Sequence, residues 1–347
     1  MTLPASSEGM QDGERSMYPV AGVVVLLAAL CGLFYYKWGG AIRTIASVHA
    51  AGGWAGTPAG LTTGGMLRET LFYFRRIWIA LLYGLLIGAA VRAFVSPRRV
   101  ANLLSRGGSV RRRVSAGVAG TPLMLCSCCI TPIFQSVYER GAPLGSALAV
   151  MLASPGLNPA ALLLTASLFP RSLAVVRIAA ALVAVFGLAP VVARAGDGAR
   201  LVAGGQFTSI AADDAPRSVG DLIARLASAL GYLTVRTLPL VFAGVLLSSL
   251  VLPAAARFST GGTLLVVALV AAVAVLVALP TFFEIPLAML FLSLGTPGAA
   301  AAMLVAGPIV NLPSLLVLAR ETRPRVAIAL ALGIWLLAVG AGLVASA

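Results

Sequence analysis

The chain has 347 residues, of which 60% are hydrophobic and only 10% are charged, and its mean hydropathy is +1.00. An ordinary soluble domain carries roughly 25% charged residues, so the composition excludes a soluble enzyme, a disordered chain and a disulfide-rich secreted module. The net charge of +14 does not indicate nucleic-acid binding, because the basic residues sit mostly between apolar runs and no recognition motif accompanies them. The lipid bilayer is the predicted partner, and no nucleic acid is expected.

The first apolar run covers residues 18–36 and follows a polar tail at 1–17. Its length is typical of a retained membrane helix rather than the shorter core of a signal peptide. A linker rich in Gly, Ala and Thr at 37–70 precedes the next apolar run at 72–95. The loop 96–113 is rich in arginine and has no acidic residue, so the positive-inside bias predicts that it faces the cytoplasm.

Further runs long enough to span a membrane continue to the C-terminus. They cover 114–138, 142–169, 173–192, 222–252, 258–319 and 326–345. A polar stretch at 194–221 separates the two halves, and a basic loop at 320–325, also expected in the cytoplasm, precedes the last run. The pattern predicts an all-α polytopic membrane protein of about eight or nine transmembrane helices in the inner (plasma) membrane.

The two halves of the chain look alike, with residues 129–159 resembling residues 283–313. Pro132, Gly141 and Pro143 match Pro286, Gly295 and Pro297 at a spacing of 154, whereas Pro155 and Asn158 match Pro308 and Asn311 at 153. Such a repeat is typical of transporters, and it would be parallel with four spans per half or inverted if one segment is re-entrant. The predicted units are a tail (1–17), an extra span plus linker (18–70), a first permease repeat (71–195), a linker (196–221) and a second permease repeat (222–347).

Proline paired with polar groups inside apolar runs predicts broken helices that meet near the midplane and form a central site. Four motifs carry this pattern: 121–132, 154–159, 280–286 and 307–313. Pro155, Asn158, Pro308 and Asn311 are the substrate-binding candidates of the P-x-x-N motifs. The competing interpretation is that each asparagine only bonds the carbonyls that its neighbouring proline leaves free.

Glu284 is the one charged residue within 258–319. A charge at mid-bilayer costs at least about 2.5–3.5 kcal/mol on insertion scales, so the carboxyl is expected to face the interior. It is the candidate for proton coupling or cation binding, and the alternative is a carboxyl that caps the broken backbone between Pro280 and Pro286.

Cys126, Ser127, Cys128 and Cys129 form the most distinctive sequence feature. Three cysteines in four positions can offer thiolates to soft ions such as Cu(I), zinc or trivalent arsenic, if the backbone near Pro132 unwinds and lets two sulfurs converge. Small apolar packing is the alternative. No resident cofactor is expected: Lys37, the only lysine, is followed by Trp, which excludes a Walker A loop, and His49 lies in the linker, where solvation is expected.

The chain resembles the ArsP-type permeases and their predicted-permease relatives over roughly residues 70–345. The resemblance rests on Cys126-Ser127-Cys128 with Pro132, on the stretch 141–145, on the stretch 280–286 and on both P-x-x-N motifs. It implies efflux of trivalent organoarsenicals such as methylarsenite, with Cys126 and Cys128 as the thiol ligands of the metalloid. The additional Cys129 and the extra N-terminal span depart from that pattern.

Two functions follow from these observations. The first is a secondary transporter, not an enzyme, that exports a small thiol-reactive metalloid or metal. The alternative is a membrane protein that handles redox or sulfur chemistry through its cysteine cluster.

Overall fold

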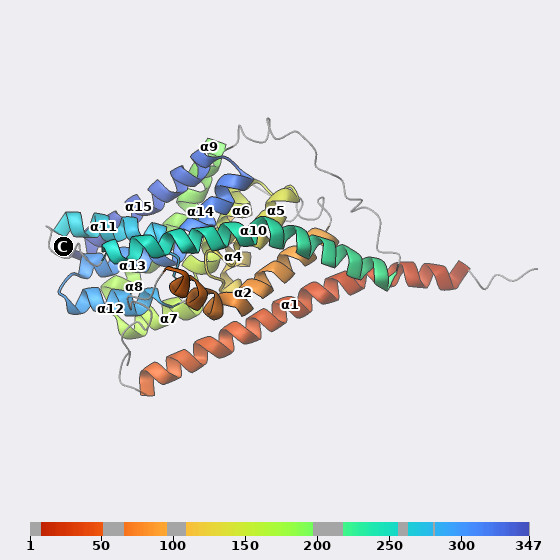
Figure 1. Cartoon of the computed structure of the whole chain (residues 1–347), viewed down its shortest axis with the longest axis horizontal. Coiled ribbons are helices and arrows are strands. Elements are labelled where there is room, and N and C mark those ends of the chain that lie inside the picture. Colours follow the sequence, from red (N-terminus) through yellow and green to blue (C-terminus); the bar gives the residue numbers. More distant parts are fainter. Residues whose placement is uncertain are drawn as a thin grey trace, which may run out of the picture.

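The computed structural model describes residues 8–50, 66–95, 109–196, 218–255, 263–279 and 282–346, and it shows a bundle of helices (Figure 1). Within these ranges there is no strand, which confirms the predicted all-helical class. The first half comprises α1 (Glu8–Ala50), α2 (Met66–Phe94), α4 (Ser109–Gly120), the 3₁₀ turn η1 (Thr121–Leu123), α5 (Thr131–Glu139), α6 (Leu144–Gly156), α7 (Pro159–Leu168), α8 (Arg171–Leu182), the π-helical stretch η2 (Val183–Leu188) and α9 (Ala189–Gly196). The second half comprises α10 (Val219–Ala255), α11 (Thr263–Leu276), α12 (Glu284–Ser293), α13 (Pro297–Ile309), α14 (Leu312–Glu321) and α15 (Pro324–Ser346).

Six helical segments of the described chain are long and apolar enough to cross a membrane. A seventh results if α13 and α14, which are bent by 43° at their junction, count as one span. The apolar helices α11 and α12 are shorter than a span. The described residues therefore give six or seven spans by length and composition, which makes the chain multi-pass but does not confirm the expected total of eight or nine.

Two expected boundaries differ from the structure. α1 continues to Ala50, well into the expected linker 37–70. The run 114–138, expected as one span, is instead divided into α4, η1, a non-helical segment and α5. The linker 196–221 and the arginine-rich loop 96–113 lie mostly outside the described residues, so the cytoplasmic placement of that loop stays a prediction.

α15 illustrates how these helices suit a bilayer. Its inward face carries Val326, Leu330, Ile334 and Ala338, all fully buried and each four residues from the next. Its outward face carries Ile328, Leu332 and Leu336, which are also apolar and more than half exposed. A helix that is apolar on both faces is stable when lipid covers the outer face.

The two halves share their helix pattern. Four consecutive helix starts of the second half follow those of the first by 153 residues: Thr131 and Glu284, Leu144 and Pro297, Pro159 and Leu312, and Arg171 and Pro324. The turns before α6 and α13 both contain a glycine of positive φ, Gly141 at 93° and Gly295 at 72°. Only glycine adopts this backbone conformation without strain, so the same turn recurs at the same place in each half.

Candidate functional site: a buried cysteine loop between two broken helices

The cysteines lie in the non-helical segment between η1 and α5, where the backbone is held by hydrogen bonds to side chains. The backbone turns at Met124, which has a left-handed φ of 49°. The Ser154 hydroxyl on α6 accepts from the backbone N–H of Leu125 at 3.0 Å. The Thr131 hydroxyl, at the start of α5, donates to the Cys128 carbonyl at 2.6 Å. These bonds satisfy backbone groups that an unwound segment leaves free in an apolar interior.

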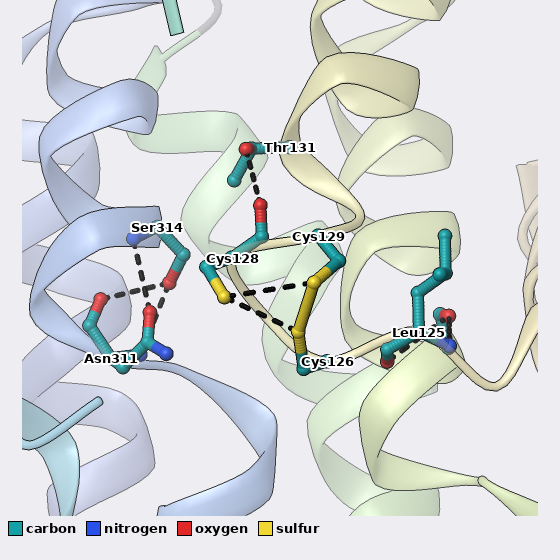
Figure 2. The surroundings of a disulfide bond; sticks show 8 residues. Leu125, Cys126, Cys128, Cys129, Thr131, Asn311 and Ser314 are labelled. Carbon is teal, nitrogen blue, oxygen red and sulfur yellow. Dashed lines mark hydrogen bonds between the residues drawn. A yellow bond between two sulfur atoms is a disulfide. The ribbon is translucent and has the colours of Figure 1, made fainter. Parts of the chain in front are cut away.

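All three cysteines of this segment are buried, and their sulfur atoms lie within 4.8 Å of one another. Cys126 and Cys129 are joined by a disulfide bond, and Cys128 stays outside that bond as a thiol (Figure 2). The Cys128 sulfur is 3.2 Å from that of Cys126 and 3.9 Å from that of Cys129. Ser127, between them, is also buried. The fourth cysteine, Cys31, is exposed on α1 and belongs to no cluster of the described residues.

The two asparagines cap the helices that follow the breaks. The Asn158 side-chain oxygen accepts from the backbone N–H groups of Ala160 and Ala161, at 3.1 and 3.3 Å. The Asn311 oxygen accepts from the backbone N–H of Ser314 at 3.1 Å, and the Ser314 hydroxyl is 3.0 Å from the N–H of Asn311. Both amides thus cap a helix start. Their oxygens accept from backbone N–H groups, whereas the structural alternative expected them to bond the carbonyls that the prolines leave free.

The side-chain nitrogen of Asn311 takes no part in the helix cap. This nitrogen is fully buried and has no hydrogen-bond partner among the described residues. Figure 2 draws Asn311, the cap residue of α14, and Ser314 of that helix among the residues that surround the disulfide. A buried amide N–H without an acceptor costs about 1–3 kcal/mol, so this donor is a candidate contact for a bound ligand.

Pro155 and Pro308 lie inside the C-terminal turns of α6 and α13, directly before the two breaks. The breaks face each other, because a Cβ placed on Gly156 would lie 3.2 Å from the Ile309 side chain. The structure therefore brings the two P-x-x-N motifs together, and the segment that carries the cysteines is bonded to the first of them through Ser154.

Glu284 begins α12 and is 2% exposed. Its carboxylate accepts from the Arg177 guanidinium of α8 at 2.9 Å, and the same guanidinium donates to the Thr165 hydroxyl of α7 at 2.6 Å. Arg177 is equally buried. The pair therefore connects the two halves, and Glu284 is not the isolated carboxyl that the sequence analysis assumed. Pro280 and Thr281 lie outside the described residues, so the expected capping of that break is not tested.

Arg177 is the partner of Glu284 that the sequence analysis missed. It is the one charged residue within the apolar run 173–192, as Glu284 is within its own run. Two lone and opposite charges inside membrane helices are a signal for a buried ion pair, and that signal was available from the sequence.

A second polar cluster ties α2 and α5 to α10 and α14. Glu139 is paired with Arg92 and accepts from the Tyr232 hydroxyl, while Arg236 is 3.2 Å from the Glu321 carboxylate. Gln135 contributes from α5: it donates to both carboxylates and accepts from the Thr237 hydroxyl at 2.9 Å. Arg140 lies in the turn beyond α5, and burial, together with the nearby Arg92 charge, lowers its pKa to about 10.

Apolar helices broken around buried sulfur and amide groups define a multi-pass membrane protein with the architecture of a transporter. Residues 67–202 match the family described as a predicted permease, ArsP_1. The chain is 28% identical over 305 residues to UPF0718 protein YraQ of Escherichia coli, covering 84% of this chain and 85% of that protein. It is 30% identical over 93 residues to UPF0718 protein MJ0584 of Methanocaldococcus jannaschii, which covers 26% of this chain and 25% of that protein. No solved structure matches significantly. Residues 67–202 of the chain therefore resemble this predicted permease family.

Proposed function

We propose that the protein is a secondary transporter that exports trivalent arsenicals, with methylarsenite as the type of cargo, from the cell across the inner membrane. The observation that carries the proposal is the buried group of three sulfur atoms within 4.8 Å. Thiolates favour soft acceptors over the hard cations that oxygen ligands select.

The reduced form of the cluster is the form that binds cargo. Cys126 and Cys129 are bonded to each other in the structure, and opening that bond makes three thiols available, as expected beside a reducing cytoplasm. A singly methylated trivalent arsenic has two bonds left for sulfur. Cys126 and Cys128, whose sulfurs are 3.2 Å apart, are the proposed pair of thiolate ligands.

The Asn311 side-chain nitrogen supplies the second reason for this choice of cargo. A hydroxylated arsenical carries oxygen acceptors as well as a thiol-reactive centre. Held by the sulfurs, it could accept a hydrogen bond from the buried amide N–H, which has no acceptor among the described residues. Ser127, Asn158, Pro155 and Pro308 shape the backbone around this position.

Replacing Cys126 or Cys128 with serine should abolish resistance to methylarsenite, because serine removes a soft ligand while keeping the size of the side chain. Replacing Cys129 with alanine should reduce resistance only mildly, since it leaves Cys126 and Cys128 as thiols. The measurement is growth of an arsenical-sensitive bacterial host, with cell-associated arsenic and protein level in the membrane. Cys31→Ser, at the exposed cysteine of α1, is the control. Full resistance in the variant without cysteines would disprove the thiol mechanism.

The disulfide favours a second candidate function, in which the cysteines carry redox or sulfur chemistry. A thiol lies beside a disulfide, and thiol–disulfide exchange requires that arrangement. The two functions differ in whether they require the Cys129 sulfur. Redox chemistry through the Cys126–Cys129 bond fails in Cys129→Ala, whereas arsenical export continues.

Glu284 is the proposed proton-coupling residue. Its ion pair with Arg177 joins α8 to α12, so protonation of the carboxylate would release a contact between the two halves. Protonation of Glu284 would thereby shift the equilibrium between two conformations, and proton coupling requires such a shift.

A further inference from the structure

The second polar cluster marks one end of the helix bundle, which we call the cluster end. Arg92 lies in the last turn of α2, and Glu139 and Glu321 are the last residues of α5 and α14. Arg92 is paired with Glu139, and Gln135 of α5 donates to Glu321 at 3.2 Å. Three helices therefore end here. α6 and α15 start here, because only a short turn separates each of them from the helix before it.

α15 runs from the cluster end to the opposite end of the bundle. At 1.5 Å per residue its 23 residues cover about 34 Å, enough to cross a hydrocarbon core of roughly 30 Å. Its last residues lie beside the start of α13, because a Cβ on Gly298 would lie 2.7 Å from the Gly342 carbonyl oxygen and would overlap the Ser346 hydroxyl. The Gly295 turn before α13 is therefore at the opposite end from the Gly141 turn before α6, although the two turns match in the repeat.

The starts of α8 and α15 give a second comparison. Ala193 of α9 would lie 3.4 Å from a Cβ placed on Gly145, near the start of α6. The apolar segment Arg171–Arg194 thus ends at the cluster end and begins at the opposite end. α15 begins at Pro324, at the cluster end. Arg171 and Pro324 match in the repeat, and they too lie at opposite ends.

The cysteine loop is the tip of a hairpin that enters from the cluster end and returns to it. At Gly120, the last residue of α4, an added Cβ would lie 2.6 Å from the Val150 carbonyl oxygen of α6. Further along α6, Ser154 meets Leu125 of the loop. The chain therefore advances along α6 away from the cluster end, and α5 leads it back to Glu139. With 12 and 9 residues, α4 and α5 are each too short to cross the core.

α11 and α12 form a second hairpin, which enters from the opposite end. Val267, near the start of α11, would be 2.9 Å from a Cβ on Gly298 and would overlap one on Gly342. Figure 1 shows α11 beside the C-terminus. α12 ends at Ser293, just before the Gly295 turn. These helices have 14 and 10 residues, which makes each of them shorter than a span.

The tips of the two hairpins lie close together inside the bundle. Met124 of the first tip forms a small core with Ala41 and Ala160, and Phe282 of the second tip packs against that core. Met124 and Phe282 are the two non-glycine residues of the described chain with positive φ, at 49° and 75°. A bulky residue in this conformation is strained, and such strain is concentrated at functional sites.

We propose that the two halves are inverted repeats, and that the binding site lies between the tips of two hairpins that enter the membrane from opposite faces. The first tip supplies the cysteines, and the second supplies Phe282 and Glu284. Glu284 lies beside the second helix break, since its Cβ would be 3.5 Å from one placed on Gly307. This inference rests on the proposed function only for the statement that cargo binds between the tips.

The cluster end is the cytoplasmic side of this arrangement. It carries Arg140 and the basic residues Arg320, Arg323 and Arg325, and the positive-inside bias places such turns in the cytoplasm. The cysteine hairpin therefore enters from the cytoplasm, and the hairpin of Phe282 enters from the other side. In transporters built from inverted repeats, one repeat moves against the other, and the site between them opens to each side in turn.

The test labels introduced cysteines at two pairs of matching positions in the full-length Cys31→Ser protein, whose three remaining cysteines are buried. Pro143→Cys and Ser293→Cys probe the turns before α6 and α13, and Ser172→Cys and Arg325→Cys probe the starts of α8 and α15. A membrane-impermeant maleimide is applied to intact bacterial cells and to permeabilised cells. We expect the variants at 172 and 293 to react in intact cells, and those at 143 and 325 only after permeabilisation. The Cys31→Ser parent should stay unlabelled.

Either pair is decisive alone, so one variant that fails to fold does not leave the question open. In a parallel repeat the two members of a pair would react from the same side, and that result for either pair would overturn the inference. Reaction of Pro143→Cys in intact cells would overturn entry of the cysteine hairpin from the cytoplasm. The labelling uses no arsenical, so it tests the inverted arrangement even if the proposed cargo is wrong.

Discussion

Replacing Glu284 with glutamine should destabilise the folded protein by about 3–5 kcal/mol, because it leaves the Arg177 guanidinium buried without its counter-charge. Arg177→Met should have a comparable effect, since it leaves the carboxylate unpaired. The double variant Arg177→Met with Glu284→Gln should recover much of the loss. The measurement is the free energy of unfolding, or the thermal midpoint, of the detergent-solubilised protein in a double-mutant cycle.

The same variants separate a structural contact from a coupling role. A double variant that is stable yet inactive, or whose transport no longer responds to pH, supports proton coupling by Glu284. If the double variant transports with the pH dependence of the parent, the pair is only a contact between the two halves. If the Glu284→Gln protein is as stable as the parent, the contact between Arg177 and residue 284 does not need both charges to stabilise the fold.

Gly84→Ala should disrupt the cysteine loop although residue 84 lies on a different helix. Gly84 and Gly88, one turn apart on α2, pack directly on the backbone of this loop and of α5. A Cβ at Gly84 would overlap the Cys129 carbonyl oxygen, and one at Gly88 would lie 2.8 Å from the Pro132 carbonyl oxygen. Small residues four apart permit such close packing between membrane segments. Because backbone cannot rotate away like a side chain, we expect a loss of about 1–3 kcal/mol or more.

The control for this variant is Gly231→Ala on α10, where an added Cβ meets nothing within 4 Å. It should be neutral or stabilise the protein by about 0.4–1 kcal/mol. The readouts are the thermal midpoint and the fraction of Cys126–Cys129 disulfide, measured by mass spectrometry without reduction. Normal disulfide formation and stability in Gly84→Ala would mean that α2 can shift freely away from the loop.

The sequence was sufficient for the helical class and for the breaks, because run length and proline act locally. The division of the run 114–138 follows from Pro132 and from the polar backbone contacts around it. The extent of α1 was not foreseen, since Gly39 and Gly40 were taken as part of a linker. A glycine costs a helix only about 1 kcal/mol, which the need to bond every backbone group in a membrane outweighs.

Contacts between distant parts of the chain could not be derived in the same way. Asn311 and the cysteines are far apart in sequence, and only the packing of the helices brings Asn311 into the surroundings of the disulfide.

The equal spacing of the helix starts in the two halves separates architecture from chemistry. At the internal match of 154 residues, Phe282 and Phe283 of the second half stand where the first has Cys128 and Cys129. Arg177 and Glu284, the partners of the buried ion pair, come from different halves. The helix pattern thus occurs twice, whereas the cysteines and each partner of the ion pair occur in one half only. Either half alone would have the broken helices but only part of the reactive side chains. The two halves therefore present unlike side chains although their helices are laid out alike.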